Sequence, residues 1–352
     1  MAFTKIKGSR IAGVATCVPQ RQFDNLKDTA QFTPEEVRKV VAMAGVHSRR
    51  VSGDSICSSD LCIAAAKTAL GSLKWEPDSI DALIMVTQTP DYFLPQTSGV
   101  IHKELKLSDR CAAFDVGLGC SGYTYGLWLA SMMIHSSGFK RVLLLHGDTP
   151  SRYAEDSDRS VALLFGDAGS ATAIEAGPTD SMPDWFFSMH TDGSGCSDMI
   201  IEGGGFRERF AEDKRKYYLK MKGANVFNFT IKRLPELINE TLGGAGIKKE
   251  DVDYYIFHQS NKYIIDHLVN KLKIPNEKVP LTLKQFGNTG GPSIPLTITQ
   301  GGLSRPSDRS LSLMLLGYGV GLSWGSALIT LGADAVLRHE GFCNNDSETF
   351  IS

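Results

Sequence analysis

The sequence predicts an α/β protein assembled from two similar halves. Short apolar runs of strand length alternate with longer segments of helical periodicity along the chain. The same order of motifs also occurs twice, about half a chain length apart. Composition agrees with a globular protein, because 42% of the 352 residues are hydrophobic and 22% are charged. A chain of this length is sufficient for roughly two domains of ordinary size.

The first half of the chain carries the clearest alternation of helix and strand. Residues 61–70 and 121–135 are predicted to be helices, and residues 82–86 and 142–145 to be buried strands. No low-complexity segment or linker rich in proline and serine interrupts the pattern. This rhythm is typical of α/β folds, in which helices cover the faces of a sheet.

An uncharged stretch near the end of the chain needs a separate interpretation. Residues 310–333 contain no charged side chain and are long enough for a membrane-spanning helix. Glycines recur throughout this stretch, which is unfavourable for a helix. We therefore predict two buried strands, residues 311–316 and 326–331, joined by a glycine loop. No contact with a membrane is expected.

The repeat is visible in three ordered correspondences. The segment Asp-Ser-Ile-Asp-Ala-Leu-Ile-Met that begins at Asp78 resembles Glu-Asp-Val-Asp-Tyr-Tyr-Ile-Phe, which begins at Glu250. Each segment is followed by a polar residue flanked by glycine, Cys120 in the first case and Asn288 in the second. Each of these residues stands 21 positions before an arginine that precedes an apolar strand. Together the correspondences favour a duplication.

We place the boundary between the halves at the Gly-Pro pair in positions 177 and 178. The predicted N-terminal half is residues 1–178, and the C-terminal half is residues 179–352. The chain contains 35 glycines and only 14 prolines. This balance indicates glycines used in tight turns and close backbone approaches rather than in linkers.

Charge and cysteine content exclude several classes of function. The 37 basic residues nearly balance 39 acidic ones, so no field that attracts nucleic acid or a membrane surface is expected. The seven cysteines include no Cys-x-x-Cys pair and the N-terminus has no signal-like apolar region, so we expect a cytoplasmic location. The histidines form no i,i+4 pair and the glycine clusters lack a following Lys-Ser/Thr. Neither a metal site nor a phosphate-binding loop is predicted.

Cys120 lies where a predicted strand turns into a predicted helix, within Gly-Leu-Gly-Cys-Ser-Gly. The free N–H groups and the positive dipole end of a helix N-terminus favour a thiolate, so we expect a lowered pKa for Cys120. The neighbouring glycines would let a substrate carbonyl approach the sulfur and nearby backbone donors. The structural alternative is that Cys120 is a small buried hydrophobic residue.

His258 and Asn288 complete a possible catalytic trio. His258 follows an apolar strand over residues 254–257, where α/β sheets expose ligand-binding residues, and Asn288 lies in a glycine-rich turn. Either residue alone could be structural, because asparagine beside glycine is common in turns. A cysteine, a histidine and an asparagine drawn from distant positions nevertheless form a known arrangement for covalent acyl chemistry.

The motifs around these residues resemble those of the β-ketoacyl-acyl-carrier-protein synthase III family of thiolase-like condensing enzymes. The resemblance extends over essentially the whole chain and rests on five segments: residues 119–122, 165–169, 258–261, 287–295 and 323–328. They read Gly-Cys-Ser-Gly, Phe-Gly-Asp-Ala-Gly, His-Gln-Ser-Asn, Gly-Asn-Thr-Gly-Gly-Pro-Ser-Ile-Pro and Ser-Trp-Gly-Ser-Ala-Leu. The resemblance implies a thiolase-like five-layer αβαβα fold from two duplicated halves, commonly present as a homodimer.

The resemblance also implies a role for each member of the trio. Cys120 would accept an acyl group as a thioester, with the backbone N–H groups of Cys120 and Val320 as the oxyanion hole. His258 and Asn288 would hydrogen-bond the thioester carbonyl of a malonyl-acyl carrier protein and stabilise the enolate left by decarboxylation. The carbanion would attack the acyl-Cys in a Claisen condensation. Because His258 would donate as a neutral imidazole, a lowered pKa is expected.

The family pattern suggests further contacts with the acyl donor, which is an acyl-CoA or an acyl-carrier protein; no bound cofactor is implied. Substrate contacts are expected at Leu94, Gly223, Phe227 and Asn261. Lys262 is expected to contact the carrier protein by charge complementarity.

Departures from the family pattern affect the expected donor. Lys39 and Met43 stand where the family usually has a Trp and an Arg that hold CoA, and Ala224 stands where it often has a CoA-contacting Asn. Leu94 stands where a Phe often crosses to the partner subunit, although a slip of one residue would put Phe93 there. Acetyl-CoA is therefore not the expected primer, and the preferred acyl length stays open.

The leading hypothesis is an acyltransferase that condenses an acyl-Cys120 intermediate with a malonyl-carrier unit, in fatty-acid or specialised-metabolite synthesis. Two alternatives remain open. The same Cys and His could transfer an acyl group to an oxygen or nitrogen acceptor without decarboxylation. The chain could also be a non-catalytic partner subunit of a condensing heterodimer.

Overall fold

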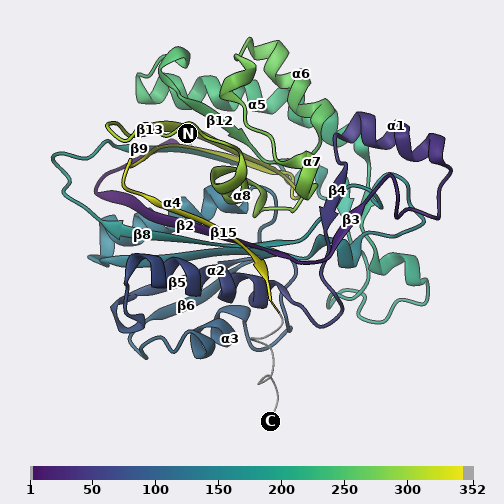
Figure 1. Cartoon of the computed structure of the whole chain (residues 1–352), viewed down its shortest axis with the longest axis horizontal. Coiled ribbons are helices and arrows are strands. Elements are labelled where there is room, and N and C mark those ends of the chain that lie inside the picture. The colour runs from purple at the N-terminus through teal and green to yellow at the C-terminus, as the bar shows by residue number, and fades with distance from the viewer. Residues whose placement is uncertain (1–2, 344–352) are drawn as a thin grey trace.

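The computed structural model describes residues 3–343 and has five layers, with two sheets separated by helices and covered by helices on both outer faces (Figure 1). The helices of the outer and central layers are α5 (Gly223–Ala245) and α6 (Lys262–Leu272) on one face, α4 (Gly122–Ser137) and α8 (Ser293–Gln300) between the sheets, and α2 (Ser58–Leu73) and α3 (Thr97–Glu104) on the other face. The predicted αβαβα arrangement is confirmed.

Most of the first sheet comes from the N-terminal part of the chain. Its six strands lie in the order β15 (Val336–Phe342), β2 (Ser9–Pro19), β8 (Ala168–Ala176), β7 (Arg141–Asp148), β5 (Ala82–Val86) and β6 (Ala112–Val116). β5 is parallel to both of its neighbours, whereas β8 is antiparallel to β7 and β2. β6 therefore forms one edge of the sheet.

The second sheet has five strands in the order β1 (Phe3–Ile6), β9 (Trp185–Thr191), β14 (Ser323–Leu331), β13 (Leu311–Gly319) and β12 (Tyr254–Phe257). β12 and β13 are parallel, and the remaining pairs are antiparallel. The two sheets thus each contain a parallel pair whose carboxyl ends can expose functional residues.

The two sheets exchange the terminal strands of the chain. β1 pairs with β9 in the second sheet, with Phe3 opposite Ser188. β15 pairs with β2 in the first sheet, with Val336 opposite Gly13. Neither sheet is therefore completed by one half of the chain alone.

The hydrophobic core consists of three main apolar layers, which explains why the strands are apolar on both faces. In β5, Ile84 and Val86 face the central layer with α4 and α8, whereas Leu83 and Met85 face the outer layer with α2 and α3. This alternation follows the two-residue period of a strand. The outer layer of the second sheet is filled by apolar residues of α5 and α6.

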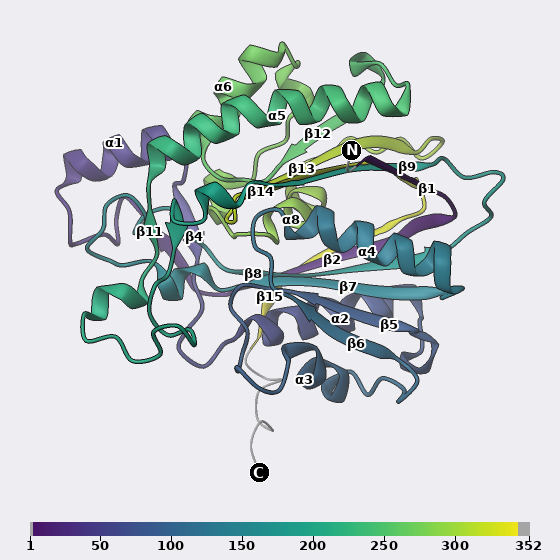
Figure 2. The ribbon, with the colours of Figure 1, turned by 180° about the vertical axis from the view of Figure 1, so that it is seen from behind.

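Smaller elements lie beyond one end of the sheets, where α1, β4 and β11 are visible in Figure 2. These elements are α1 (Pro34–Ala44), β3 (Gln22–Asp24), β4 (Ser48–Arg50), β10 (Met199–Ile200), β11 (Lys220–Met221) and α7 (Leu283–Phe286). α1 begins with a capping box between Thr33 and Glu36 and ends at Gly45, which adopts the left-handed conformation.

The structure confirms the predicted elements with adjusted ends. Residues 82–86 are β5, and residues 142–145 lie within β7. The hairpin predicted from the uncharged stretch is also present, but its strands continue through the glycines, so that Gly317 of β13 lies opposite Gly325 of β14. A Cβ atom on Gly317 would lie 2.8 Å from the Cα of Ser121, so glycine here permits close contact with the start of α4. No helix within residues 3–343 is long and apolar enough to cross a membrane.

Candidate active site

Cys120 is buried in the turn that connects β6 to α4, next to the end of β13. A Cβ atom on Gly319 of β13 would lie 2.7 Å from the Cβ of Cys120, so only glycine fits there without displacement. The candidate nucleophile from the first sheet is thereby held against a strand of the second sheet.

The backbone N–H groups of Val320 and Cys120 interact with the Cys120 sulfur, and both lower the pKa of the thiol. Burial and the negative charge of Asp148 have the opposite effect and together raise this pKa to about 12. The lowered pKa expected from the helix N-terminus is therefore wrong for the free site. The loss of solvation of the thiolate outweighs the backbone donors.

His258 follows the carboxyl end of β12 and is almost completely buried. Its backbone N–H donates to the carbonyl oxygen of Leu316 in β13 at 2.7 Å, and its Nδ1 lies 2.8 Å from the Oγ of Ser293. Burial is the main cause that lowers the pKa of His258 to about 3, although an interaction with the Gly290 backbone acts in the opposite direction. The expectation of a neutral imidazole is therefore met.

Asn288 lies in the turn that leads to α8, and its side chain is held at both ends. Its Oδ1 accepts a hydrogen bond from the N–H of Gly290 at 3.0 Å, and its Nδ2 donates to the carbonyl oxygen of Ser260 at 3.3 Å. Its backbone pairs with Phe165, and its N–H donates to the carbonyl oxygen of Leu164 at 2.9 Å. These contacts fix the carboxamide of a buried residue.

A continuous set of contacts joins the three residues at the end of β13. The Tyr318 hydroxyl donates to the carbonyl oxygen of His258 at 3.2 Å, and the next residue, Gly319, packs on Cys120. Phe165 lines a pocket together with Cys120 and pairs with Asn288. The structure thus brings together the trio that the sequence drew from distant positions.

Two further buried polar residues lie beside this trio, His146 and Asp148 of β7. Oδ1 of Asp148 accepts from the N–H of Gln88 at 2.8 Å, while Oδ2 lies 3.5 Å from Nε2 of His146. A Cβ atom on Gly291 would lie 1.8 Å from the His146 ring. Sequence reasoning missed both residues, although their position after the predicted strand 142–145 was an available signal.

A pocket of about 190 Å³ opens beside the Cys120 side chain. Most of its lining is apolar. The lining residues are Gln88, Cys120, Tyr153, Phe165, Met199, Ile200, Ile201, Leu219 and Val320. Val320 therefore lines the pocket, and its backbone N–H also interacts with the sulfur.

Leu94 does not reach this pocket within one chain. Its side chain is 85% exposed, and the neighbouring Phe93 is 62% exposed and packs against Phe206 with ring centroids 5.5 Å apart. The interpretation of Leu94 as an acyl contact therefore finds no support in a single copy of the chain.

The other predicted substrate contacts lie at the starts of α5 and α6 and do not line the pocket beside Cys120. Phe227 of α5 stacks on Tyr263 of α6 with ring centroids 5.5 Å apart, and Gly223 is exposed at the first position of α5. Asn261 caps α6, because its Oδ1 accepts from the N–H of Ile264 at 2.9 Å. A helix cap explains this asparagine without a substrate.

The predicted carrier-protein contact Lys262 lies on the surface, as do Lys39 and Met43, which stand at the family's CoA-binding positions. Lys262 forms an ion pair with Asp266 one turn along α6, and Lys39 of α1 forms one with Glu35 at 2.8 Å. Met43 of α1 is 59% exposed. These side chains are accessible, but the charges of both lysines are already partly compensated.

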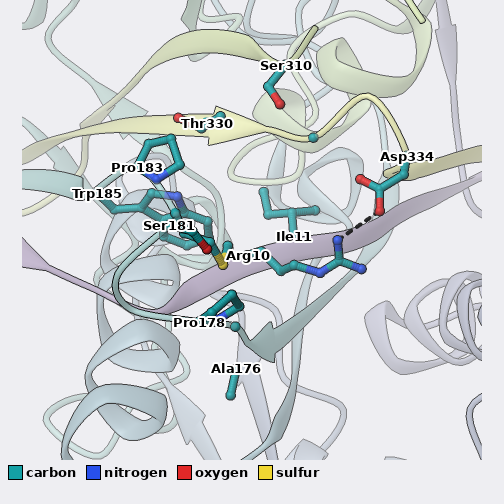
Figure 3. Close-up of a pocket in the computed structure, with 13 residues that line it drawn as sticks. Arg10, Ile11, Ala176, Pro178, Ser181, Pro183, Trp185, Ser310, Thr330 and Asp334 are labelled. Atoms are coloured by element: carbon teal, nitrogen blue, oxygen red, sulfur yellow. Dashed lines mark hydrogen bonds and ion pairs between the residues drawn. The ribbon is translucent and has the colours of Figure 1, made fainter. Parts of the chain in front are cut away.

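A larger surface cavity of about 440 Å³ lies where the chain passes from β8 to β9 (Figure 3). Figure 3 shows Arg10 directed at Asp334, with Arg10 Nη1 and Asp334 Oδ2 2.8 Å apart, and the other amino group of Arg10 also contacts Glu175. Trp185 and Pro178 form part of its apolar wall. The Arg10 guanidinium is thus already paired with two carboxylates, so it is not free to bind a ligand in this cavity.

Among residues 3–343, no group of three or more His, Cys, Asp or Glu side chains could hold a metal ion.

Two family models match the chain. Residues 114–193 match 3-oxoacyl-[acyl-carrier-protein (ACP)] synthase III, and residues 242–331 match the C-terminal part of the same enzyme. The putative 3-oxoacyl-[acyl-carrier-protein] synthase 3 of Campylobacter jejuni is 33% identical over 342 residues, covering 93% of this chain and 95% of the relative. A β-ketoacyl-[acyl-carrier-protein] synthase III of Streptomyces coelicolor is 34% identical over 333 residues, covering 92% and 97%.

Solved structures give the same result. The crystal structure of 3-oxoacyl-(acyl-carrier protein) synthase from Burkholderia xenovorans LB400 superposes with a TM-score of 0.91 at 41% identity, covering 96% of this chain and 98% of that one. The priming β-ketosynthase of the R1128 polyketide pathway superposes with a TM-score of 0.81 at 27% identity, covering 93% and 97%. The chain belongs to the 3-oxoacyl-acyl-carrier-protein synthase III family and is a thiolase-like condensing acyltransferase of fatty-acid or polyketide synthesis.

Proposed function

We propose that Cys120 carries the acyl group in this condensing enzyme and that His258 and Asn288 activate the malonyl-carrier substrate. One observation supports the proposal above all others. Two backbone N–H groups interact with the sulfur of Cys120, at an apolar pocket. The neutral His258 and the fixed Asn288 are connected to this site through Tyr318 and Phe165. Donors that are already oriented stabilise a developing oxyanion without reorganisation.

In the loading step, the Cys120 sulfur attacks the carbonyl carbon of an acyl thioester. The new S–C bond forms as the S–C bond to CoA or to the carrier breaks, and the thiol proton passes to the departing thiolate. The N–H groups of Cys120 and Val320 hold the oxyanion of the tetrahedral intermediate. Because burial keeps the thiol protonated, the sulfur has to lose this proton as it attacks the thioester carbonyl.

In the condensation step, the malonyl thioester carbonyl accepts hydrogen bonds from His258 and Asn288. We assign the ring proton of His258 to Nε2, with the Ser293 hydroxyl donating to Nδ1. The malonyl carboxylate leaves as carbon dioxide, and its electron pair forms the enolate. The enolate carbon then attacks the acyl carbon on Cys120, the S–C bond of the acyl-Cys breaks, and the released thiolate takes a proton from water.

The loading step is tested by mass spectrometry of the intact protein after incubation with acyl-CoA and acyl-carrier donors. We expect an adduct on Cys120 that is absent from Cys120→Ala. Addition of malonyl-carrier should then release carbon dioxide and a β-ketoacyl product. An adduct on a different cysteine would refute the role of Cys120, and acyl transfer to an alcohol or amine without carbon dioxide release would refute condensation.

We infer that the working form is a homodimer. β6 forms an open edge of the six-stranded sheet, and all five of its residues are exposed or partly exposed. The exposed Tyr92, Phe93 and Leu94 come just before α3, which packs next to β6. An unpaired edge beside exposed apolar side chains favours pairing with a second copy. Light scattering of the purified protein should give twice the chain mass; a monomer that is fully active would refute the inference.

We propose that residues 1–178 and 179–352 arose by duplication. Asp81 precedes β5, which runs parallel to β7, and Asp253 precedes β12, which runs parallel to β13. The helices α4 and α8 follow Cys120 and Asn288 in turn. Equivalent motifs therefore occupy equivalent elements, which supports the division into two halves that share one site.

Lys262 remains our proposed contact for the carrier protein, whose acidic surface would compete with Asp266 for the ammonium group. Reversal of this charge in Lys262→Glu should raise the KM for malonyl-carrier while the rate of Cys120 acylation by a small thioester stays unchanged. An unchanged KM would refute the assignment.

A further inference from the structure

The pocket beside Cys120 contains two polar side chains without a protein partner. Gln88 and Tyr153 both line it, among otherwise mainly apolar residues. Within residues 3–343, neither the Gln88 carboxamide nor the Tyr153 hydroxyl makes a hydrogen bond to another residue. Both residues are only partly buried, so water can reach these groups when the pocket is empty. An acyl group that fills the pocket displaces this water and has to replace its hydrogen bonds.

Gln88 is positioned directly beside the nucleophile turn. Its backbone N–H donates to Oδ1 of the buried Asp148 at 2.8 Å, which fixes the start of the side chain. A Cβ atom on Gly119 would lie 1.9 Å from Oε1 of Gln88, so the carboxamide occupies the space that a side chain at the residue before Cys120 would need. The carboxamide therefore lies at the thioester end of the pocket.

Tyr153 approaches the same space from the segment after β7. Its ring contacts Phe165 edge to face, with centroids 5.8 Å apart, and its carbonyl oxygen accepts from the N–H of Leu219 at 2.9 Å. Both neighbours line the pocket. Burial raises the pKa of Tyr153 well above its ordinary value, and Asp148 and Cys120 lie near enough to raise it further. The hydroxyl is therefore a neutral donor and acceptor.

We infer that the acyl group loaded on Cys120 is short and carries a hydroxyl or keto oxygen near its thioester end, held by the Gln88 carboxamide and the Tyr153 hydroxyl. This inference rests on the proposed function of Cys120. A plain hydrocarbon chain would displace water from both groups and leave them unpaired, which disfavours it. A cavity of roughly 150 Å³ holds a benzene molecule, so the pocket of about 190 Å³ fits a short substituted acyl group.

The bond changes are those of ordinary thioester exchange. The Cys120 S–C bond forms, the S–C bond of the donor breaks, and the proton moves from the Cys120 thiol to the donor thiolate. The hydroxyl or keto oxygen of the acyl group is unchanged and only exchanges hydrogen bonds. No oxidant or reductant is required.

The experiment uses N-acetylcysteamine thioesters of butyric, 3-hydroxybutyric and 3-oxobutyric acid, which need neither a CoA site nor a carrier site. The rate of Cys120 acylation is followed by intact mass for the wild type, Gln88→Leu, Tyr153→Phe and the exposed control Gln300→Leu. We expect at least one oxygenated donor to react about tenfold faster than the butyryl donor in the wild type and in Gln300→Leu. Comparison of the two oxygenated donors separates hydroxyl from keto.

In Gln88→Leu and Tyr153→Phe the preference should fall several-fold, through slower reaction of the oxygenated donor. Equal rates for all donors in the wild type, or a preference unchanged in both variants, would overturn the inference while leaving the proposed function intact. The polar side chains would then bind water only. Failure of every donor to label Cys120 would overturn the proposed function itself, and this inference with it.

Discussion

The two halves of the molecule share a local arrangement, an aspartate that joins the starts of two parallel strands, but carry different functional residues. We call this arrangement the frame. The Asp81 carboxylate accepts hydrogen bonds from the backbone N–H groups of Lys140 and Arg141 and so joins the start of β5 to β7. The Asp253 carboxylate accepts from the N–H of Ser312 and from Arg309 and joins the start of β12 to β13. The frame is thus repeated near one end of the strands, whereas the functional residues at the other end differ.

At those carboxyl ends the first half supplies a thiol and the second supplies hydrogen-bond donors. Burial raises the pKa of Cys120 to about 12 and lowers that of His258 to about 3. Both groups are therefore uncharged at neutral pH, in contrast to a thiolate paired with an imidazolium. The two residues differ in type, but the same cause, loss of solvation, keeps both of them uncharged.

The largest expected effects come from variants of Cys120 and Asn288, which separate acyl loading by the first half from condensation by the second half. Cys120→Ala should abolish acyl loading and condensation together. Asn288→Ala should keep loading within a few-fold but lower the condensation rate about 100- to 1,000-fold, because one donor to the enolate is lost. Intact mass measures loading, and release of labelled carbon dioxide measures decarboxylation. If Asn288→Ala also lost loading, the division of labour between the halves would be refuted.

A second prediction concerns the contact between the halves at Gly319. Gly319→Ala places a methyl group against Cys120, so we expect the free energy of unfolding to fall by about 1–3 kcal/mol and the condensation rate by about 100-fold. The matched control is Gly243→Ala in α5, where a Cβ atom meets nothing within 4 Å. Denaturant unfolding and steady-state rates measure both effects. Equal behaviour of the two variants would show that the contact does not position Cys120.

The pKa of Cys120 predicts how its alkylation depends on pH. Below a pKa of about 12, the thiolate fraction rises about tenfold per pH unit, so the rate of carbamidomethylation of Cys120 by iodoacetamide should rise about tenfold per unit from pH 7 to 9.5. Peptide mapping, with Cys120→Ser as the control, assigns the label to this residue. A plateau near neutral pH would show that the helix N-terminus, rather than burial, dominates.

The smallest effect tests the repeated aspartates. Asp81→Asn and Asp253→Asn should each lower the free energy of unfolding by about 1–3 kcal/mol, because each removes a charged acceptor of backbone N–H groups. The exposed Asp109→Asn should change it by less than about 0.5 kcal/mol. Urea unfolding measures all three variants. A neutral result for only one of the repeated aspartates would mean that the frame is not equivalent in the two halves.

The strands and the trio were accessible from the sequence because their signals are local. β5 is a continuous apolar run, Cys120 lies in the turn between β6 and α4, and His258 directly follows β12. An α/β sheet exposes its functional residues at such strand ends. The exchange of β1 and β15 was not accessible, because short terminal strands carry no information about which sheet they join. Strand pairing depends on tertiary packing.

Other features of the site depend on residues far away in the chain. The pKa of Cys120 could not be predicted correctly from the helix N-terminus, since its burial is completed by Gly319 of β13. Gln88 and Asp148 look like ordinary residues near the ends of strands in the sequence. Only the fold brings them together, so that the backbone N–H of Gln88 donates to the Asp148 carboxylate. For Asn261, the cap of α6 accounts for the residue without a substrate, so its substrate contact stays a prediction.

The exchange of terminal strands has a consequence for the order in which the protein can be made. As the chain leaves the ribosome, β2 appears long before its partner β15, because the other strands of both sheets except β1 lie between them in the sequence. β1 likewise waits for β9, which follows only after the first sheet has received most of its strands. Closing such distant pairs is slow and carries a high entropic cost. The second sheet is therefore completed only when synthesis has reached β14, and the first only when it has reached β15.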